Sequence, residues 1–390
     1  MSTLEKTARL LWENKKYSHA GDILNMATEY ANTPQELRAL LDNARMCYFH
    51  ANQVPRALAC IDKCLAQQLP VEWNMYRDRA NYLRYLNRYQ EAEQCLEQVQ
   101  DPDTKNLARS WFLHRKGFYK QAFESAELAR KSYWWGTRKP LDLPLWDRQY
   151  HDKIVIFGES GAGDEIIFAR FINLIRPYCR ELYYYTDNSL LQVFCRNFNV
   201  LPYDPKITDC VMVPAMSMSY LLELTEPSNV PYITSDPSLA ARYTKDRTRI
   251  GVCFHGDPDH YETNLRTLPE ELLVDSFSDL AEVVNLQYGY ISKNKNLVQY
   301  SFNTWEETFA LLDTCDFIVT CDTSIAHAAG ALGKPVIVLM HGAAYFTWNH
   351  NEPMGTSTWY KQSYCIKQTE PCQWEGSIKQ ARKLIMEILK

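Results

Sequence analysis

The sequence predicts an all-α N-terminal part followed by two α/β halves. In the first third of the chain, amphipathic helical segments alternate with short polar turns. From Ile154 onward, short apolar runs alternate with helical stretches, and one of these runs, at 286–291, is interpreted as a strand. Such alternation builds parallel sheets with right-handed crossovers. We place the helical part at residues 1–133, the first α/β half at 134–245 and the second at 246–390.

The composition is that of a globular protein without a membrane span. The chain has 390 residues, of which 46% are hydrophobic and 23% charged, with a formal net charge of −5. No apolar run approaches the roughly 18 residues of a transmembrane helix, and the first residues lack a signal-peptide pattern. The 12 cysteines include no CxxC pair, and Cys60 and Cys64 are expected to be buried thiols. We therefore expect a cytoplasmic protein without structural zinc.

The helical part contains a repeated pair of helices. The second helix of each pair is predicted to begin at Tyr17, Val54, Tyr89 and Tyr119, and an alanine follows each of these residues three positions later. Their spacing is close to the ~34-residue period of tetratricopeptide repeats, which this segment resembles. A small alanine lets paired helices approach closely. We expect a short solenoid that either offers a surface to a protein or peptide, or braces the α/β part.

Basic and aromatic residues are interleaved at the end of the helical part. Between Lys105 and Lys139, basic residues far outnumber acidic ones. Such a mixture is typical of a polyanion-binding groove, but a solvated helix face above core aromatics gives the same pattern. The candidate contacts for a polyanion are Arg109, Arg115, Lys116 and Lys120.

A glycine loop, GESGAGD, follows the strand-like run that ends at Phe157. It fits neither the dinucleotide fingerprint, nor the Walker loop, nor the hydrolase elbow. The pattern therefore indicates a tight loop whose backbone lies close to a ligand, with Glu159, Gly161 and Gly163 as its candidate residues. Asp164 lies in the first helical turn, where the helix dipole favours its ionised form. It either accepts a proton from an attacking hydroxyl or simply caps the helix.

A second strand-to-helix junction lies near the end of the chain. The apolar run FIVTC leads into Asp322, Thr323 and Ser324, which are residue types that begin helices, and the helix IAHAAGALG follows. The N-terminus of a helix at the carboxyl end of a parallel strand binds anions, because its N–H groups and its dipole point there. His327, one turn into the helix, either meets a bound phosphate or belongs to the core.

Three separated motifs resemble tetratricopeptide-repeat glycosyltransferases related to the family 9 heptosyltransferases. They are GESGAGDEIIFARFI, RIGVCFHGDPDHYETNLRTLP and VTCDTSIAHAAGALGKPVIVL, and the element STWYKQS at 357–363 accompanies the third. Their order and spacing agree with those of the family, and the resemblance covers about residues 134–390. The chain departs from the family at His255 and Gly256, where tryptophan followed by alanine or serine is usual, near the expected contacts of the nucleotide or sugar.

The resemblance implies a GT-B fold of two Rossmann-like halves. It also implies metal-independent, inverting transfer of a hexose or pentose from a nucleotide-diphosphate sugar to an acceptor hydroxyl, without a cofactor. Asp164 would act as the base, and the glycine loop would lie on the acceptor side. The residues expected around the donor diphosphate are Thr323, Ser324, His327, Asp322, Arg266 and Lys334.

The acceptor is left open by the sequence. A protein, a glycan and a modified nucleic acid are all compatible with it. The nucleic-acid alternative is a hydroxymethylated base, which would have to be flipped out of a duplex at a cost of a few kcal/mol. A different class of function is a non-catalytic repeat scaffold with a degenerate transferase domain.

Overall fold

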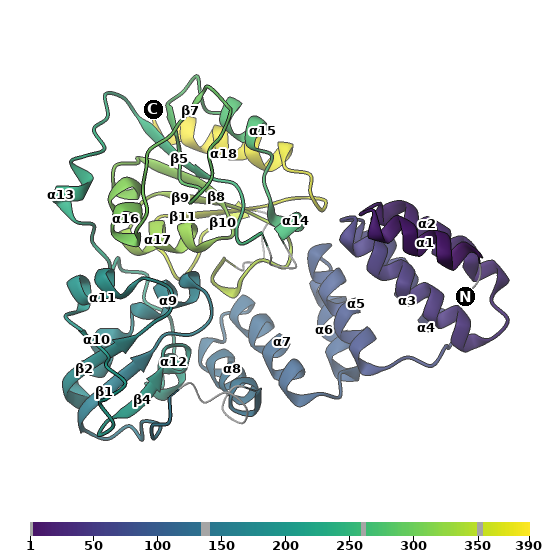
Figure 1. Ribbon diagram of the computed structural model, residues 1–390, viewed down its shortest axis with the longest axis horizontal. Helices are drawn as coiled ribbons and strands as arrows, with labels where there is room; N and C mark the ends of the chain where they lie inside the picture. Colours follow the sequence, from purple (N-terminus) through teal and green to yellow (C-terminus); the bar gives the residue numbers. More distant parts are fainter. Residues whose placement is uncertain (1–2, 134–140, 259–262, 349–353) are drawn as a thin grey trace. The chain divides into compact units, whose positions relative to one another are not determined.

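The computed structural model describes residues 3–133, 141–258, 263–348 and 354–390 (Figure 1). The chain divides into two compact units, each of which is described by itself. The first contains residues 1–109 with the short segments 341–343 and 369–373, and the second contains the remainder.

The first unit is built from paired helices. They are α1 (Thr3–Glu13), α2 (Tyr17–Ala27), α3 (Pro34–His50), α4 (Val54–Ala66), α5 (Trp73–Tyr85) and α6 (Tyr89–Cys95). The division between the units falls within α7 (Pro102–Arg115), and α8 (Tyr119–Tyr133) belongs to the second unit. The second helices of the pairs begin at the four predicted residues, so the prediction of tetratricopeptide-like repeats is confirmed.

The turn within each helix pair has the same backbone geometry. The residue two positions before each second helix is left-handed, with φ between 57° and 79°. These residues are Lys15, Asn52, Asn87 and Gly117. The alanines Ala20, Ala57, Ala92 and Ala122 are fully buried, which confirms that they lie where the paired helices meet.

The second unit contains two separate sheets. The first is parallel, in the order β3-β2-β1-β4, and consists of β1 (His151–Phe157), β2 (Cys179–Tyr185), β3 (Leu201–Pro202) and β4 (Val211–Pro214). Its helices are α9 (Ala162–Ala169), α10 (Ile172–Ile175), α11 (Leu191–Phe198) and α12 (Met218–Leu221). Ile154 and Ile156 face the core that α9 and α11 share, whereas Val155 and Tyr183 belong to a small cluster on the other face.

The second sheet has seven strands in the order β10-β11-β9-β8-β5-β6-β7. They are β5 (Arg249–Cys253), β6 (Glu282–Asn285), β7 (Leu297–Val298), β8 (Phe317–Cys321), β9 (Val336–Met340), β10 (Met354–Gly355) and β11 (Ser363–Lys367), and only the β10–β11 pair is antiparallel. The helices are α13 (Pro237–Ala240), α14 (Thr263–Arg266), α15 (Glu270–Asp275), α16 (Trp305–Asp313), α17 (Ser324–Leu332) and α18 (Glu375–Ile388). Two mainly parallel α/β sheets after a helical part confirm the predicted fold class.

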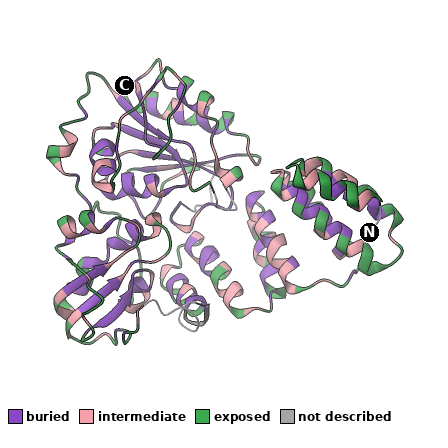
Figure 2. Cartoon of the chain, viewed as in Figure 1, coloured by how far each residue is buried: buried purple, intermediate pink, exposed green. Residues whose placement is uncertain are grey.

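Helices cover both faces of the seven-stranded sheet (Figure 1). Helices α15 and α18 pack on one face, whereas α16 and α17 pack on the other. The central strands β5, β8 and β9 are buried along their whole length (Figure 2). The core on the α16–α17 face is continuous with the core of the first sheet, so the two halves share apolar packing.

The prediction of a strand at 286–291 is wrong. The strand β6 ends at Asn285, because its side chain accepts a hydrogen bond from the Gln287 N–H at 2.8 Å and donates one to the Tyr290 carbonyl at 2.9 Å. These bonds fold the chain into a turn in place of a sheet ladder. Gly289 within this turn has a φ of 68°.

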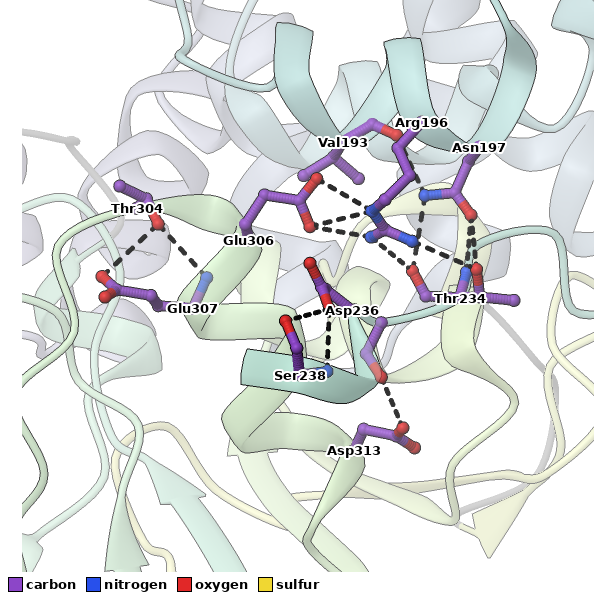
Figure 3. Close-up of polar contacts among 11 residues, drawn as sticks. Val193, Arg196, Asn197, Thr234, Asp236, Ser238, Thr304, Glu306, Glu307 and Asp313 are labelled. Carbon is purple, nitrogen blue, oxygen red and sulfur yellow. Dashed lines mark hydrogen bonds and ion pairs between the residues drawn. The ribbon is translucent and has the colours of Figure 1, made fainter. Parts of the chain in front are cut away.

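A polar network surrounds the bridge between the two α/β halves (Figure 3). Arg196 of α11 donates to the Glu306 carboxylate of α16 at 2.7 Å and to the Thr234 carbonyl at 2.7 Å. Asn197 accepts from the Thr234 N–H at 2.8 Å, and Asp236 caps α13 through the Ser238 N–H. Ser235 of the bridge donates to the Asp313 carboxylate of α16 at 2.5 Å, so the bridge is tied to a helix of each half.

Gly330 of α17 lies directly under an aromatic ring, and we expect Gly330→Ala to destabilise the protein. A β-carbon there would overlap the ring of Tyr360. Overpacking of this kind costs about 1–3 kcal/mol of unfolding free energy, measured by urea denaturation.

The matched control is Gly376→Ala in α18, where a β-carbon would meet nothing within 4 Å. This variant should be neutral or gain about 0.4–1 kcal/mol, since alanine restricts the unfolded chain. Equal effects of the two substitutions would contradict the packing described for α17.

Candidate functional site

The glycine loop is shaped by its own backbone and by a buried carboxylate. Ser160 has a φ of 64°, and Gly161 is extended and precedes α9. Gly158 lies so close to Glu165 that a β-carbon there would overlap the carboxylate. No pattern in the sequence pointed to Glu165, although it is the residue next to Asp164.

Glu165 is fully buried beneath the loop. Its carboxylate accepts hydrogen bonds from the hydroxyls of Tyr184 at 3.1 Å and Thr186 at 2.7 Å, and from the Asn188 amide. Asn188 also donates to the Ser160 carbonyl at 3.2 Å. Burial raises the pKa of Glu165 to about 7, although the three donors oppose this shift. The carboxylate thereby supports the loop from below.

Glu159 is held by an arginine of the helical part. Arg130 of α8 donates to both oxygens of Glu159, at 2.6 and 2.7 Å, and the side chains of this ion pair are less than a tenth exposed. The Met216 N–H also donates to Glu159, at 3.2 Å. The carboxylate of Glu159 is thus engaged within the protein, and its role is to anchor the loop to α8.

Asp164 lies at the first turn of α9 and is partly buried. One carboxylate oxygen accepts the Gly161 N–H at 3.2 Å, so Asp164 caps its own helix. The other oxygen accepts the hydroxyl of Tyr345 at 2.5 Å. Burial raises the pKa of Asp164 above its ordinary value, whereas the hydrogen bonds from Tyr345 and Gly161 oppose this.

The structure brings the glycine loop against the N-terminus of α17. A β-carbon on Gly163 would lie 3.2 Å from Cδ2 of His327 and 3.5 Å from Cα of Ser324. The two predicted site segments, which are far apart in the sequence, therefore pack directly against each other.

The residues that begin α17 have different surroundings. Thr323 is buried, and its hydroxyl lies 3.2 Å from the hydroxyl of Thr320 without capping the helix. Ser324 is partly exposed. The Asp322 carboxylate accepts the Tyr345 N–H at 2.7 Å and the indole N–H of Trp348 at 3.0 Å. Asp322 therefore holds the loop after β9, which is a structural task.

His327 is buried in an aromatic cage. Its ring stacks on Trp348 with centroids 4.8 Å apart, and its Nδ1 lies 3.1 Å from the Tyr360 hydroxyl. Burial lowers the pKa of His327 to about 3, and the charge of Arg170 lowers it further. His327 is therefore neutral at physiological pH, so it can meet a phosphate only as a neutral hydrogen-bond donor.

Arg170 supports this cage from below and was not predicted. It is buried, and it donates to the Trp359 carbonyl at 2.7 Å and to the Tyr232 hydroxyl at 3.2 Å. Its guanidinium also lies 4.7 Å from the centre of the Tyr360 ring. Arg170 and Tyr360 both lie within the quoted motifs, FARFI and STWYKQS, which is the signal that could have pointed to them.

Of the two predicted charge partners, only Arg266 lies at this end of α17. It donates to the Asp322 carbonyl at 3.3 Å, and its guanidinium packs against Gly256, where a β-carbon would lie 2.7 Å from Nη2. Lys334 follows the C-terminus of α17 and donates to the Asp313 carbonyl at 2.6 Å. The helix therefore separates Lys334 from the residues that begin it.

In the described part of the basic stretch, Phe118 is the large aromatic residue that is exposed, and it lies between Lys116 and Lys120 in the sequence. Lys116 and Lys120 are exposed and Arg115 is partly buried, but the neighbouring Trp111 and Phe112 are core residues. Arg109 is exposed and belongs to the first unit. Residues 134–140 of this stretch lie outside the described residues.

Two further observations concern the described residues only. Among them, no three His, Cys, Asp or Glu side chains are grouped so that they could hold a metal ion. None of the described helices has the length and apolarity that crossing a membrane requires.

A segment of the C-terminal half matches a known family. Residues 304–381 fit the sequence profile of glycosyltransferase family 9 (heptosyltransferase), and this segment contains α17 and the loop that carries Tyr345. The predicted relation to this family is confirmed. This match indicates a glycosyltransferase, and tetratricopeptide-like repeats precede the matching segment in the chain. No curated protein matches it significantly.

Several solved structures are similar to the chain at low identity. A family 9 glycosyltransferase from Veillonella parvula is 13% identical with a TM-score of 0.43, over 61% of this chain and 92% of that one. The ADP-heptose LPS heptosyltransferase II of E. coli is 12% identical with a TM-score of 0.40, and the match covers 60% of this chain and 99% of that one. An O-GlcNAc transferase mutant from Thermobaculum terrenum is 12% identical with a TM-score of 0.31, and the match covers 90% of this chain and 86% of that one.

The buried, neutral state of His327 predicts a loss of stability in acid. The unfolded chain binds a proton at this residue below pH 6.5, whereas the folded protein does so only near its folded pKa of about 3. Stability is therefore lost as the pH falls below 6.5. Between pH 7.5 and 5 the loss from this group is about 2 kcal/mol, and His327→Gln should remove it in urea denaturation.

The control for this experiment is His19→Gln. His19 is exposed, so its solvent surroundings change little on unfolding. The stability that His19→Gln loses in acid should therefore equal the stability that the unmodified protein loses. If His327→Gln and the unmodified protein lost equal stability, His327 would be taking up its proton in the folded state.

Proposed function

We propose that this chain moves a hexose or pentose from a nucleoside-diphosphate sugar to an acceptor hydroxyl, without a metal and with inversion at the anomeric carbon. The observation that carries the proposal is the packing of Gly163 against α17, which sets Asp164 close to the N-terminus of that helix. A base for the acceptor and a positive site for the leaving diphosphate are what this reaction requires.

The N-terminus of α17 is the proposed diphosphate site. Because the Thr323 side chain does not cap this helix, the first N–H groups of α17 are left for a ligand, together with the partly exposed Ser324. Arg266 adds a positive charge at the preceding carbonyl, and its Nε has no hydrogen-bond partner among the described residues. These groups would offset the charge on the departing diphosphate, which is the task of a metal in other transferases.

Asp164 is the proposed base. A carboxylate whose pKa lies above the ordinary value is a better proton acceptor, provided that it is still ionised at the working pH. Asp164 would take the proton of the acceptor hydroxyl as that oxygen bonds to the anomeric carbon. The bond from this carbon to the diphosphate breaks in the same step, and the diphosphate leaves with the electron pair.

A protein or glycan acceptor is favoured over a nucleic-acid base. Base binding by the basic stretch depends on exposed aromatic rings for stacking. Trp111 and Phe112 are buried, and the Trp111 indole donates to the Ala344 carbonyl at 2.9 Å. Of the aromatics in the described part of this stretch, Phe118 is exposed and lies between Lys116 and Lys120, and one such ring offers little area for stacking bases.

We expect Asp164→Asn to abolish transfer while leaving donor binding intact. General-base catalysis contributes roughly 10²–10⁴-fold, so turnover should fall by at least 100-fold. Turnover is measured as release of nucleoside diphosphate from a panel of nucleotide sugars with peptide and glycan acceptors. The control is Asp236→Asn, which removes a carboxylate that also caps a helix, α13, in the bridge. Full turnover in Asp164→Asn would exclude this residue as the base.

Nucleoside diphosphates should stabilise the protein through the N-terminus of α17. A ligand present at 100 times its Kd adds about 2.7 kcal/mol of stability, which a thermal-shift panel detects. Ser324→Ala and Arg266→Met should reduce this shift. Lys334→Met is the matched control, because Lys334 lies beyond the other end of the helix. A loss of the shift in Lys334→Met alone would place the diphosphate elsewhere.

A further inference from the structure

Tyr345 connects the two segments of the candidate site. It lies in the loop after β9, and its backbone N–H donates to the Asp322 carboxylate at 2.7 Å. Asp322 also accepts the Trp348 indole N–H, so it fixes the loop at two points. The hydroxyl of Tyr345 then donates to Asp164 at 2.5 Å. Tyr345 thus links the residues before α17, through its backbone, to the acid of the glycine loop, through its hydroxyl.

The hydrogen bond from Tyr345 fixes the Asp164 carboxylate but leaves it able to accept further hydrogen bonds. A carboxylate has about four lone-pair sites, two on each oxygen. Tyr345 uses one site on Oδ1 and the Gly161 N–H uses one on Oδ2. Each oxygen therefore keeps a site for a further donor, such as an acceptor hydroxyl. With a donor on each oxygen, the carboxylate can no longer rotate freely.

Tyr345 always acts as the donor in this pair. Burial and the neighbouring Asp164 raise the pKa of Tyr345 well above its usual range, so its hydroxyl keeps its proton. A hydrogen bond donated to a carboxylate favours the ionised form of that carboxylate. It therefore opposes the effect of burial on Asp164.

We infer that Tyr345 is a positioning residue of the transfer reaction, whose hydroxyl orients the Asp164 carboxylate and stabilises its charge. The inference rests on the proposed role of Asp164 as the base. Because Tyr345 belongs to the donor half and Asp164 to the acceptor half, the bond exists only while the halves are together. Asp322 takes part indirectly, since it holds the Tyr345 backbone next to the proposed diphosphate site.

Other charged groups face this pair and bear on any pH dependence. Arg130 and Glu159 influence Asp164, but they form an ion pair with each other. Glu165 follows Asp164 in the chain, and its own pKa is about 7. Asp322 lies behind Tyr345, and the neutral His327 ring is 6.2 Å from the Tyr345 ring. All of these groups are unchanged by a substitution that removes only the Tyr345 hydroxyl.

The test is the pKa of Asp164, measured by 13C NMR on protein labelled at its aspartate carboxyl groups and assigned with Asp164→Asn. In Tyr345→Phe the carboxylate loses a donor that favours its charge, so this pKa should rise by about one unit. The acidic limb of the pH–turnover profile should move to higher pH by the same amount.

The matched control is Tyr183→Phe. Tyr183 also donates to a carboxylate, Glu181, at 2.6 Å, but it lies on the opposite face of the first sheet from α9. This variant should leave the pKa of Asp164 unchanged. A second variant places 3-fluorotyrosine at position 345, where the more acidic hydroxyl is a stronger donor and should lower the pKa of Asp164. Mere loosening of the loop cannot produce shifts of opposite sign.

The outcomes separate the inference from the proposed function. If the pKa of Asp164 is the same in Tyr345→Phe, in the fluorinated protein and in the unmodified protein, the inference is wrong even when Asp164→Asn is inactive. If Asp164→Asn keeps full turnover, Asp164 is not the base, and the proposed function fails whatever the pKa does. Should Tyr345→Phe fail to fold, the fluorinated protein alone decides, because it keeps both ring and hydroxyl.

Discussion

The close approach of α9 and α17 at Gly163 is the contact on which the candidate site depends. A β-carbon at this position would press on His327 and on the backbone of Ser324. With glycine, the helix that carries Asp164 and the helix that begins at Ser324 can meet at their N-termini. Two helix N-termini that converge create a region of positive potential. One of them is already offset by Asp164, and the other, on α17, is left for an anion.

The carboxylates around this region are each engaged by a different donor. Glu159 is paired with Arg130, Glu165 is buried under three neutral donors, and Asp322 holds the loop of Tyr345. Asp164 follows Gly163, the residue that packs against α17, and it is bonded to the loop through the Gly161 N–H. This division explains why acidic residues can crowd a site proposed for a diphosphate. Three of them are satisfied within the protein, and their charges are therefore not directed at a ligand.

The sequence predicted local features well because local chemistry decides them. The first residue of the second helix was predicted correctly in each repeat, because short-range sterics decide where a left-handed turn residue and a buried alanine can lie. The strand at 286–291 failed because the periodicity of apolar residues does not register the side-chain bonds of Asn285. The resemblance to the family also put Lys334 near the donor diphosphate, and in the structure the length of α17 lies between Lys334 and Ser324.

Hydrogen-bond and ion-pair partners that lie far apart in the sequence could not be predicted from it. Nothing in the local pattern around Tyr345 indicates that its hydroxyl reaches a carboxylate 181 positions away. Arg130 looked like one more cation of a basic stretch, and its burial against Glu159 becomes visible only when α8 is placed beside the glycine loop. Such pairs depend on tertiary packing, for which a single sequence carries no periodic signal.

The last helix of the repeat array clarifies what the array does for the α/β part. Phe123 of α8 lies in the same core as Ile154 and Ile318, which come from the two sheets. Glu127 accepts the Ser217 hydroxyl at 2.7 Å, and Arg130 fixes the glycine loop. A helix that supplies core packing and a buried ion pair cannot be removed without exposing both. The bracing role therefore holds for α8, and a binding role for the array would have to be carried by the helices that precede it.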